Sequence, residues 1–328
     1  LTLHWLHACP AALSPLPYPR DSLGTAWRRV LLNQIHDILP GTSIAEVYQD
    51  AAREYSAAKK SARAILDRSL AALADSMDTR PARPGERPFL VFNASGRERS
   101  GIVHLPLGRD AEVRDARGRV LRSALSDSTL DVQVEDVPAL GISLLFVSGA
   151  NAAPSRITEQ PSPRRRVLEN DALRVEIDAA TGNIARLYDK TLHRESLSPN
   201  AGALLLMEDV PAEWQAWNID NLRGKRSWID EAVRVDSVVR TALDASLTVH
   251  RERDSVRVSE RYILRDAPAR LDIALSIDWR GRERLLKLVL PLAFHVDSTR
   301  AEIPYASIAR PTRRARRTTS LRDTMNRR

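Results

Sequence analysis

The spacing of apolar residues changes from helical to strand-like across one proline-rich segment, residues 80–88. Before this segment, apolar side chains recur every three or four residues, whereas after it they form short runs separated by Gly, Asp, Asn and Ser. The segment itself, R-P-A-R-P-G-E-R-P, continues neither pattern, because proline breaks helices and interrupts sheet ladders. We therefore expect an α+β chain, with a short helical bundle followed by an all-β antiparallel sandwich region.

Two amphipathic helices are predicted before the proline-rich segment. The first is expected to begin at Ser22, as an N-cap, and to end before Pro40-Gly41. Ser43 and Glu46 then form the S-x-x-E pattern of a capping box, which predicts the start of the second helix. The second helix carries one long apolar stripe, and the first helix can cover only part of that stripe.

The clearest strand of the second half is predicted at Leu271–Trp279, where apolar and polar residues alternate without a break. Such alternation gives a strand one apolar face, which we expect to be buried in a sandwich. By contrast, residues 149–166 are rich in Pro, Ala, Ser and Arg and predict a linker.

These boundaries predict four regions. Residues 1–80 form part of a helical domain, residues 81–150 a small β domain, residues 151–312 part of a β-sandwich domain, and residues 313–328 an arginine-rich irregular tail.

The positive charge of the chain is concentrated in its tail. The net charge is +8, and residues 310–328 carry eight arginines against one acid, Asp323, a net +7. The remaining residues are therefore nearly neutral, which argues against a basic nucleic-acid-binding surface. Nucleic-acid binding through the tail is the weakest function hypothesis, and we expect no nucleic-acid partner.

Cysteine usage and hydropathy favour a cytoplasmic protein. Cys9 is the one cysteine, so an internal disulfide and a cysteine-based zinc site are excluded within this sequence. No apolar run approaches the ~18 residues that a membrane span requires, and no secretory signal is evident. We therefore expect no membrane association.

Residues 31–44, L-L-N-Q-I-H-D-I-L-P-G-T-S-I, place His36 and Asp37 where the first helix ends. Considered alone, a histidine at a helix end most often interacts favourably with the helix dipole, and an aspartate there often makes a turn hydrogen bond. The whole segment, however, resembles the N-Q-F-H-D-I-L-P-G-[ST]-S-I motif of the glycoside hydrolase family 38 α-mannosidases. Ile35 stands where that family usually has Phe.

Two further segments share this resemblance, in the order found in that family. W-Q-A-W-N-I-D at 214–220 is similar to W-D-A-W-D-I-D, and E-I-P-Y-A-S-I-A-R-P-T at 302–312 is similar to E-x-P-Y-G-x-I-x-R-P-T. Gln215 and Asn218 replace acids of the family pattern, so a role that needs a carboxylate at either position is in doubt. Ala306 replaces a glycine.

The resemblance implies a zinc-dependent enzyme that hydrolyses α-mannosidic bonds with retention. In that family an N-terminal β/α barrel supplies the nucleophilic Asp and three zinc ligands. On matching positions, His36 becomes the fourth zinc ligand and Asp37 a sugar-binding group. Trp217 and Tyr305 become candidate substrate contacts, although a tryptophan beside predicted strands, such as Trp214 or Trp217, more often packs in a core.

The N-terminal catalytic barrel is absent from this sequence, because no βαβα alternation precedes the first helix. One histidine cannot hold zinc tightly, and no catalytic residue is assigned in the chain. We therefore expect an inactive part of a larger enzyme whose partners are an α-mannoside and the missing barrel. The alternative is a non-catalytic β-sandwich module that binds carbohydrate or another protein. The oligomeric state and the mannose linkage stay open.

Overall fold

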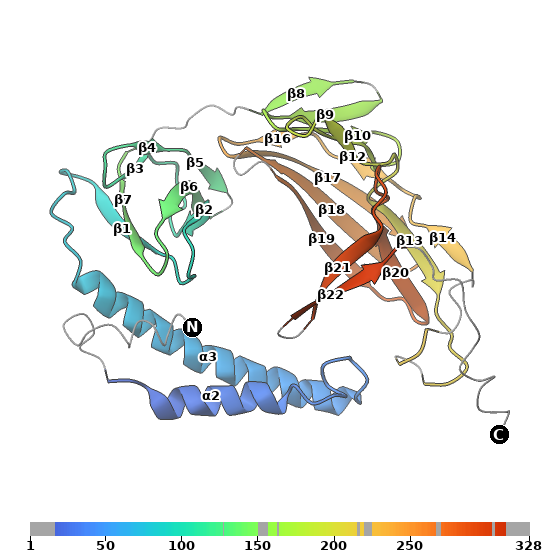
Figure 1. Ribbon diagram of the computed structural model, residues 1–328, viewed down its shortest axis with the longest axis horizontal. Coiled ribbons are helices and arrows are strands. Elements are labelled where there is room, and N and C mark those ends of the chain that lie inside the picture. Colours follow the sequence, from blue (N-terminus) through green and yellow to red (C-terminus); the bar gives the residue numbers. More distant parts are fainter. Residues whose placement is uncertain are drawn as a thin grey trace.

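In the computed structural model, two helices lead into a series of antiparallel sheets (Figure 1). The structure describes residues 17–126, 128–149, 157–162, 164–214, 217–219, 225–266, 270–303 and 306–312. Tyr305, the tail at 313–328 and Cys9 lie outside these residues. No β/α barrel occurs within the described ranges, and the α+β fold class is confirmed. Neither helix of this part of the chain is long and apolar enough to cross a membrane.

The two helices, α2 (Arg20–Leu32) and α3 (Ala45–Asp75), lie side by side and are joined by a loop of residues 33–44 (Figure 1). Ala51, Ala58 and Ile65, spaced seven residues apart, form the buried stripe of α3. An ion pair of 2.9 Å between Arg29 Nε and Glu54 Oε2 links the two helices. The apolar side chains on successive turns of α3 face the partner helix, so the packing of the two helices against each other follows from the sequence pattern.

Both predicted N-caps, Ser22 and Ser43, are wrong. Helix α2 begins at Arg20, directly after Pro19, so Ser22 lies inside its first turn and does not cap it. Pro19 takes the N-cap position, and its carbonyl accepts from the Leu23 backbone N–H (3.0 Å). Helix α3 has no side-chain cap, and the Ser43 backbone N–H instead donates to Tyr48 Oη (2.9 Å). The capping box is therefore replaced by a tyrosine contact.

Two small sheets follow the proline-rich segment and enclose a core of their own. Leu130, Val132, Leu145 and Val147 are almost fully buried between them. The first sheet has the order β1 (Arg87–Phe92), β7 (Ile142–Val147), β3 (Val113–Asp115) and β4 (Val120–Leu121). The second has the order β2 (Arg99–Leu105), β6 (Thr129–Val137) and β5 (Ser123–Ser126).

A larger sandwich follows, in which one sheet packs against two others. The common sheet has the order β15 (Arg234–Val235), β17 (Asp244–Arg253), β18 (Val256–Arg265) and β19 (Arg270–Trp279), and β16 (Val239–Arg240) also pairs with β17. The second sheet has the order β12 (Arg194–Leu197), β11 (Ile184–Asp189), β10 (Leu173–Asp178), β9 (Arg165–Glu169) and β8 (Thr158–Pro161). The third has the order β14 (Arg226–Trp228), β13 (Ala203–Glu208) and β20 (Arg284–Val289), and β21 (Ser298–Ile303) pairs separately with β22 (Ala306–Pro311).

Alternation on β17 and β18 builds the two cores of this sandwich. Leu247, Val249, Tyr262 and Leu264 pack against residues of β9, β10 and β11, among them Ile177. At the other end of β18, Val256 and Val258 pack against β13 and β20. Residues opposite each other in an antiparallel pair share a face, so the register Leu247↔Tyr262 places both side chains inside.

Two strand predictions need correction. Strand β8 lies within the predicted linker 149–166, and strand β9 overlaps its end. The sequence pattern did not reveal β9 because arginines precede its buried apolar pair, Val167 and Leu168. The strand predicted at Leu271–Trp279 is confirmed, but its apolar face is covered only at one end. Leu271 and Ile273 pack on the core, whereas the apolar side chains of the remaining half, Leu275, Ile277 and Trp279, are exposed.

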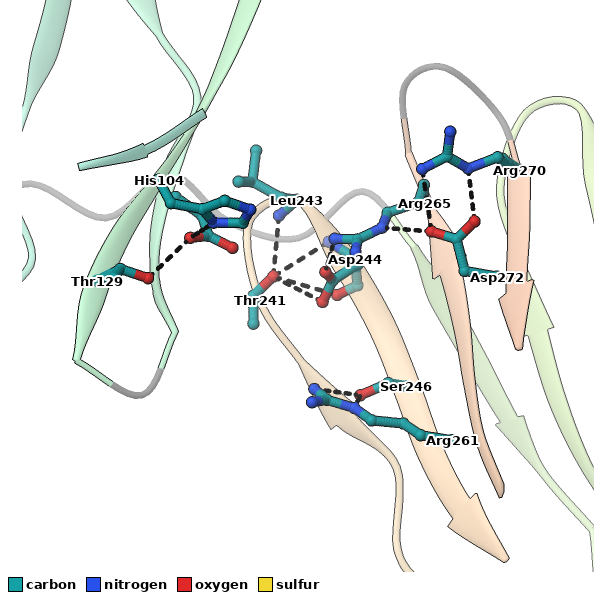
Figure 2. Close-up of polar contacts among 11 residues, drawn as sticks. His104, Thr129, Thr241, Leu243, Asp244, Ser246, Arg261, Arg265, Arg270 and Asp272 are labelled. Atoms are coloured by element: carbon teal, nitrogen blue, oxygen red, sulfur yellow. Dashed lines mark hydrogen bonds and ion pairs between the residues drawn. The ribbon is translucent and has the colours of Figure 1, made fainter. Parts of the chain in front are cut away.

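Charged side chains fix the ends of the central strands beside the smaller sheets (Figure 2). Arg265 donates from Nη1 to Asp244 Oδ2 (2.6 Å) and from Nε to Asp272 Oδ2 (3.1 Å), joining β17, β18 and β19. Nearby, an ion pair between Arg122 and Asp266 connects the smaller sheets to the sandwich. An apolar cluster at the same junction adds packing and consists of Ile102, Ala124, Ala242 and Leu243.

Candidate functional site

The α2–α3 loop carries the His36–Asp37 pair predicted from the sequence. The first helix ends at Leu32, so both residues lie within the loop and not at the helix end itself. Asn33 is buried at the start of the loop, and its side-chain amide donates to the Arg29 carbonyl (2.8 Å). Gly41 has φ +85°, a left-handed conformation that glycine adopts without the strain of a Cβ.

One backbone carbonyl, that of Asp37, organises the loop. It accepts hydrogen bonds from the Thr42 backbone N–H (3.1 Å), from Thr42 Oγ1 (3.2 Å) and from Tyr48 Oη (3.1 Å). Tyr55, two turns further along α3, donates from Oη to the Asn33 carbonyl (3.1 Å). The second helix therefore holds the loop backbone at two points, which limits its movement while the side chains stay accessible.

The side chains of His36 and Asp37 remain accessible on this anchored backbone. Their exposed fractions are 80% and 48%, and His36 Nε2 lies 3.4 Å from Asp37 Oδ2. Asp37 Oδ1 also accepts a weak hydrogen bond from Thr42 Oγ1 (3.4 Å), which is the local turn contact that the sequence left open. An exposed imidazole and carboxylate on a fixed backbone are available to a ligand or a metal.

No group of three or more His, Cys, Asp or Glu side chains within the described ranges is placed to hold a metal ion. His36 therefore stands as a single potential ligand in this part of the chain.

The second predicted segment, W-Q-A-W-N-I-D, follows β13 and exposes its aromatic residues. Trp217 is 54% exposed, and Trp214 is also exposed, so the expectation that they pack in a core is wrong. The Trp217 backbone N–H donates to the Trp214 carbonyl (2.9 Å), and Asn218 Nδ2 donates to the Glu213 carbonyl (3.2 Å). Tyr305, in the third segment, lies outside the described residues. In the view of Figure 1, the α2–α3 loop and the chain after β13 lie in the lower part of the molecule, and the β21–β22 hairpin lies nearer its middle.

Two other histidines make hydrogen bonds to carboxylates that the sequence did not predict. His104 Nδ1 lies 2.6 Å from Asp131 Oδ1, which also accepts from Thr129 Oγ1 (3.1 Å; Figure 2). His250 contacts Asp236 Oδ2 through Nε2 (2.9 Å) and Ser259 Oγ through Nδ1 (3.0 Å). His104 and Asp131 are cross-strand partners on β2 and β6, whereas His250 pairs with Ser259 across β17 and β18 and Asp236 lies just after β15. Neither histidine joins His36 in a metal-binding group within the described ranges.

A buried charge pair inside the sandwich is the largest feature that the sequence analysis missed. Arg251 Nε donates to Glu260 Oε2 (2.7 Å), and the two side chains are 1% and 0% exposed. Burial raises the pKa of Glu260, and the Arg251 guanidinium opposes this shift. Both residues interrupt apolar alternation, Leu247-Val249-Arg251 on β17 and Val256-Val258-Glu260 on β18, and that interruption is the signal by which they could have been found.

Comparison with known families identifies the chain. The model described as "Alpha mannosidase middle domain" matches residues 3–73, and that of the "Glycosyl hydrolases family 38 C-terminal domain" matches residues 168–325. Together the two matches cover more than two thirds of the sequence. The chain belongs to glycoside hydrolase family 38. The resemblance inferred from the His36–Asp37 motif and its two companion segments is thereby confirmed.

Several curated family 38 relatives are similar over most of this chain. Alpha-mannosidase 2C1 from Mus musculus is 23% identical over 315 residues, which is 90% of this chain and 27% of that protein. Alpha-mannosidase G from Dictyostelium discoideum is 21% identical over 334 residues, 90% of this chain and 30% of that protein. The chain thus spans between about a quarter and a third of the length of these relatives.

Solved family 38 structures share the fold. An alpha-mannosidase from Enterococcus faecalis V583 superposes with a TM-score of 0.76 at 16% identity, covering 95% of this chain and 43% of that one. A second Enterococcus faecalis protein of the family gives a TM-score of 0.75 at 17% identity, covering 94% and 45%. The helix pair, the small sheets and the sandwich therefore recur together in this family.

Proposed function

We propose that this chain is the part of a larger zinc-dependent α-mannosidase that follows the catalytic barrel and hydrolyses α-mannosidic bonds, with retention, only together with it. The observation that carries the proposal is the α2–α3 loop, where the family motif places the exposed His36 and Asp37 side chains on a backbone fixed by Tyr48 and Tyr55. The nucleophile of a retaining glycosidase would lie in the barrel, so the chain alone is proposed to be inactive.

His36 fits the role of one zinc ligand. Its imidazole is exposed, and a neutral imidazole nitrogen is a normal zinc ligand at ~2.0–2.1 Å. Since a tight site needs further ligands, the other three are proposed to come from the barrel. A bound zinc would supply Lewis-acid chemistry and orient hydroxyl groups of the substrate.

Asp37 and Trp217 are proposed to bind the substrate. The half-exposed Asp37 carboxylate can accept hydrogen bonds from sugar hydroxyls. The exposed indole of Trp217 offers an apolar face to a sugar ring. Tyr305 remains a proposed substrate contact on the strength of the sequence motif.

The test compares the isolated chain with the protein translated from the complete gene. The isolated chain should release no fluorophore from 4-methylumbelliferyl α-mannoside, whereas the complete protein should, with the α-anomer of mannose formed first by NMR. His36→Ala in the complete protein should lower bound zinc, measured by elemental analysis, whereas Asp37→Asn should raise KM and leave the zinc content unchanged. Full zinc binding and activity in His36→Ala would refute the assigned role.

A cytoplasmic location is also proposed, supported by the single cysteine of the sequence. Fractionation of cells that express the complete protein would test it.

A further inference from the structure

The smaller sheets and the large sandwich meet at a junction near β5 and β16 (Figure 1). The apolar cluster of this junction, within the described ranges, consists of Ile102, Ala124, Ala242 and Leu243, two of which are alanines. Two units joined by a small apolar interface can move relative to each other, because little burial resists the movement. Polar contacts at the junction are therefore needed to fix one relative orientation.

Arg122, which lies between β4 and β5, makes such contacts. Its Nη1 pairs with the Asp266 carboxylate and its Nη2 donates to the Ala242 carbonyl, so one guanidinium is attached to the sandwich at two points. The side chains of Arg122 and Asp266 are 16% and 9% exposed, so salt screens the pair little. Both backbones are fixed as well. The Arg122 carbonyl accepts from the Gln133 N–H (2.9 Å), and the Asp266 N–H donates to the Leu243 carbonyl (3.0 Å).

The helix that holds the His36–Asp37 loop is attached to the same smaller sheets. Arg114 of β3 donates from Nη2 to the Pro81 carbonyl (3.0 Å) and from Nε to Glu86 Oε1 (2.7 Å). Both acceptors lie in the proline-rich segment that follows α3. A continuous series of contacts therefore runs from the His36–Asp37 loop through α3 and the smaller sheets to Arg122, which joins this series to the sandwich.

We propose that Arg122 is a positioning residue, which fixes the helix pair and the smaller sheets on the sandwich and thereby places the His36–Asp37 loop relative to Trp217. The role of Trp217 and of the loop as substrate contacts rests on the proposed function. A substrate held by both units requires one arrangement of them, and a displacement of about 1 Å can slow a reaction about a hundredfold. Arg122 acts through this arrangement and does not contact the substrate.

The first test measures the distance between spin labels on the two units of the 328-residue protein. Cys9→Ser removes the native thiol, and Lys60→Cys on α3 and Ser276→Cys on β19 supply two exposed attachment sites. Double electron–electron resonance should give one narrow distance distribution for this labelled parent. A broad distribution in the parent would overturn the proposal.

Variants at the junction then test Arg122 itself. Arg122→Ala should broaden the distance distribution by about a factor of two or more, because the polar contacts that fix the orientation are lost. Arg122→Lys should broaden it less, since one ammonium group cannot match both acceptors, and this milder variant decides the test if Arg122→Ala does not fold. Arg174→Ala is the matched control, because its ion pairs with Glu169 and Glu176 stay within one sheet, and it should leave the distribution unchanged. Distributions in the folded Arg122 variants that equal that of the parent would overturn the proposal.

The second test uses the complete protein and separates positioning from a general loss of structure. Arg122→Lys should raise KM for 4-methylumbelliferyl α-mannoside about fivefold or more, whereas bound zinc and the melting temperature should stay close to those of Arg174→Ala. An unchanged KM would overturn the placement of the His36–Asp37 loop by Arg122. A complete protein without mannosidase activity would refute the proposed function, and the label distances would still decide whether Arg122 fixes the two units.

Discussion

Replacing Arg251 by methionine should strongly destabilise the large sandwich. The substitution removes both hydrogen bonds of the guanidinium and leaves the fully buried Glu260 carboxylate without its cation. Loss of one partner of a buried ion pair costs about 3–5 kcal/mol, most of it from the uncompensated charge that remains. Arg251→Met should therefore lower the free energy of unfolding by about that amount at neutral pH, and the double variant Arg251→Met/Glu260→Leu should recover most of the loss.

The pH dependence gives a second check on the same reasoning. Burial raises the pKa of Glu260, and removing Arg251 removes the group that opposes this rise. An acid whose pKa is raised on folding binds a proton more tightly in the folded state, so its contribution to stability decreases as the pH rises above its ordinary value. Urea unfolding followed by tryptophan fluorescence at pH 5 and pH 8 should show Arg251→Met closer to wild type at pH 5. The reasoning would be refuted if Arg251→Met lowered the free energy of unfolding by less than about 1 kcal/mol. It would also be refuted if the double variant lost as much stability as the Arg251→Met and Glu260→Leu single variants added together.

Four further outcomes follow from the geometry. Tyr48→Phe removes the hydroxyl that donates to the Asp37 carbonyl and accepts from the Ser43 N–H, and it should lower stability by about 1–2 kcal/mol and speed amide exchange at Ser43. Glu86 makes a bidentate pair with Arg114, which lowers the pKa of Glu86 to about 2, so this pair should stabilise the fold above about pH 4.5 and lose its effect as the pH falls toward 2. Glu86→Gln should therefore differ from wild type in melting temperature at pH 6, and a constant difference down to pH 2.5 would contradict this assignment. Gly202→Ala should cost about 2 kcal/mol or more, because φ is +81° and a Cβ would lie 2.5 Å from Tyr262 Oη, whereas Gly85→Ala, at φ +83° in open space, should show only the backbone cost in the same unfolding assay. Trp27 is exposed beside an apolar hollow of the helix pair, so Trp27→Ser should reduce the binding of a hydrophobic dye without lowering the melting temperature.

The strand that the sequence predicted most clearly, Leu271–Trp279, is one in which every second residue is apolar, and the structure places it at Arg270–Trp279. Strands β9, β21 and β22 were missed because arginines and small polar residues occupy much of their length, and pairing with a neighbouring strand, not apolar burial, defines them. The N-cap of the second helix was missed for a related reason. A capping box is a local preference worth about 1 kcal/mol, and the tertiary contact of Tyr48 with the loop replaces it.

The His36–Asp37 site was recognised from a family motif, because nothing in the local pattern distinguishes a ligand from a helix-end histidine. Arg251 and Glu260, by contrast, were accessible to physical reasoning. A strand of period two leaves no choice of side, so position 260 faces inward whatever residue occupies it. The register Val249↔Glu260 then makes Arg251 the inward diagonal neighbour of Glu260 on the adjacent strand. A charge inside an otherwise apolar alternation therefore predicts a buried partner two residues from the opposing position. Such a pair is retained at a cost in desolvation, and each charge depends on the other to stay in the core.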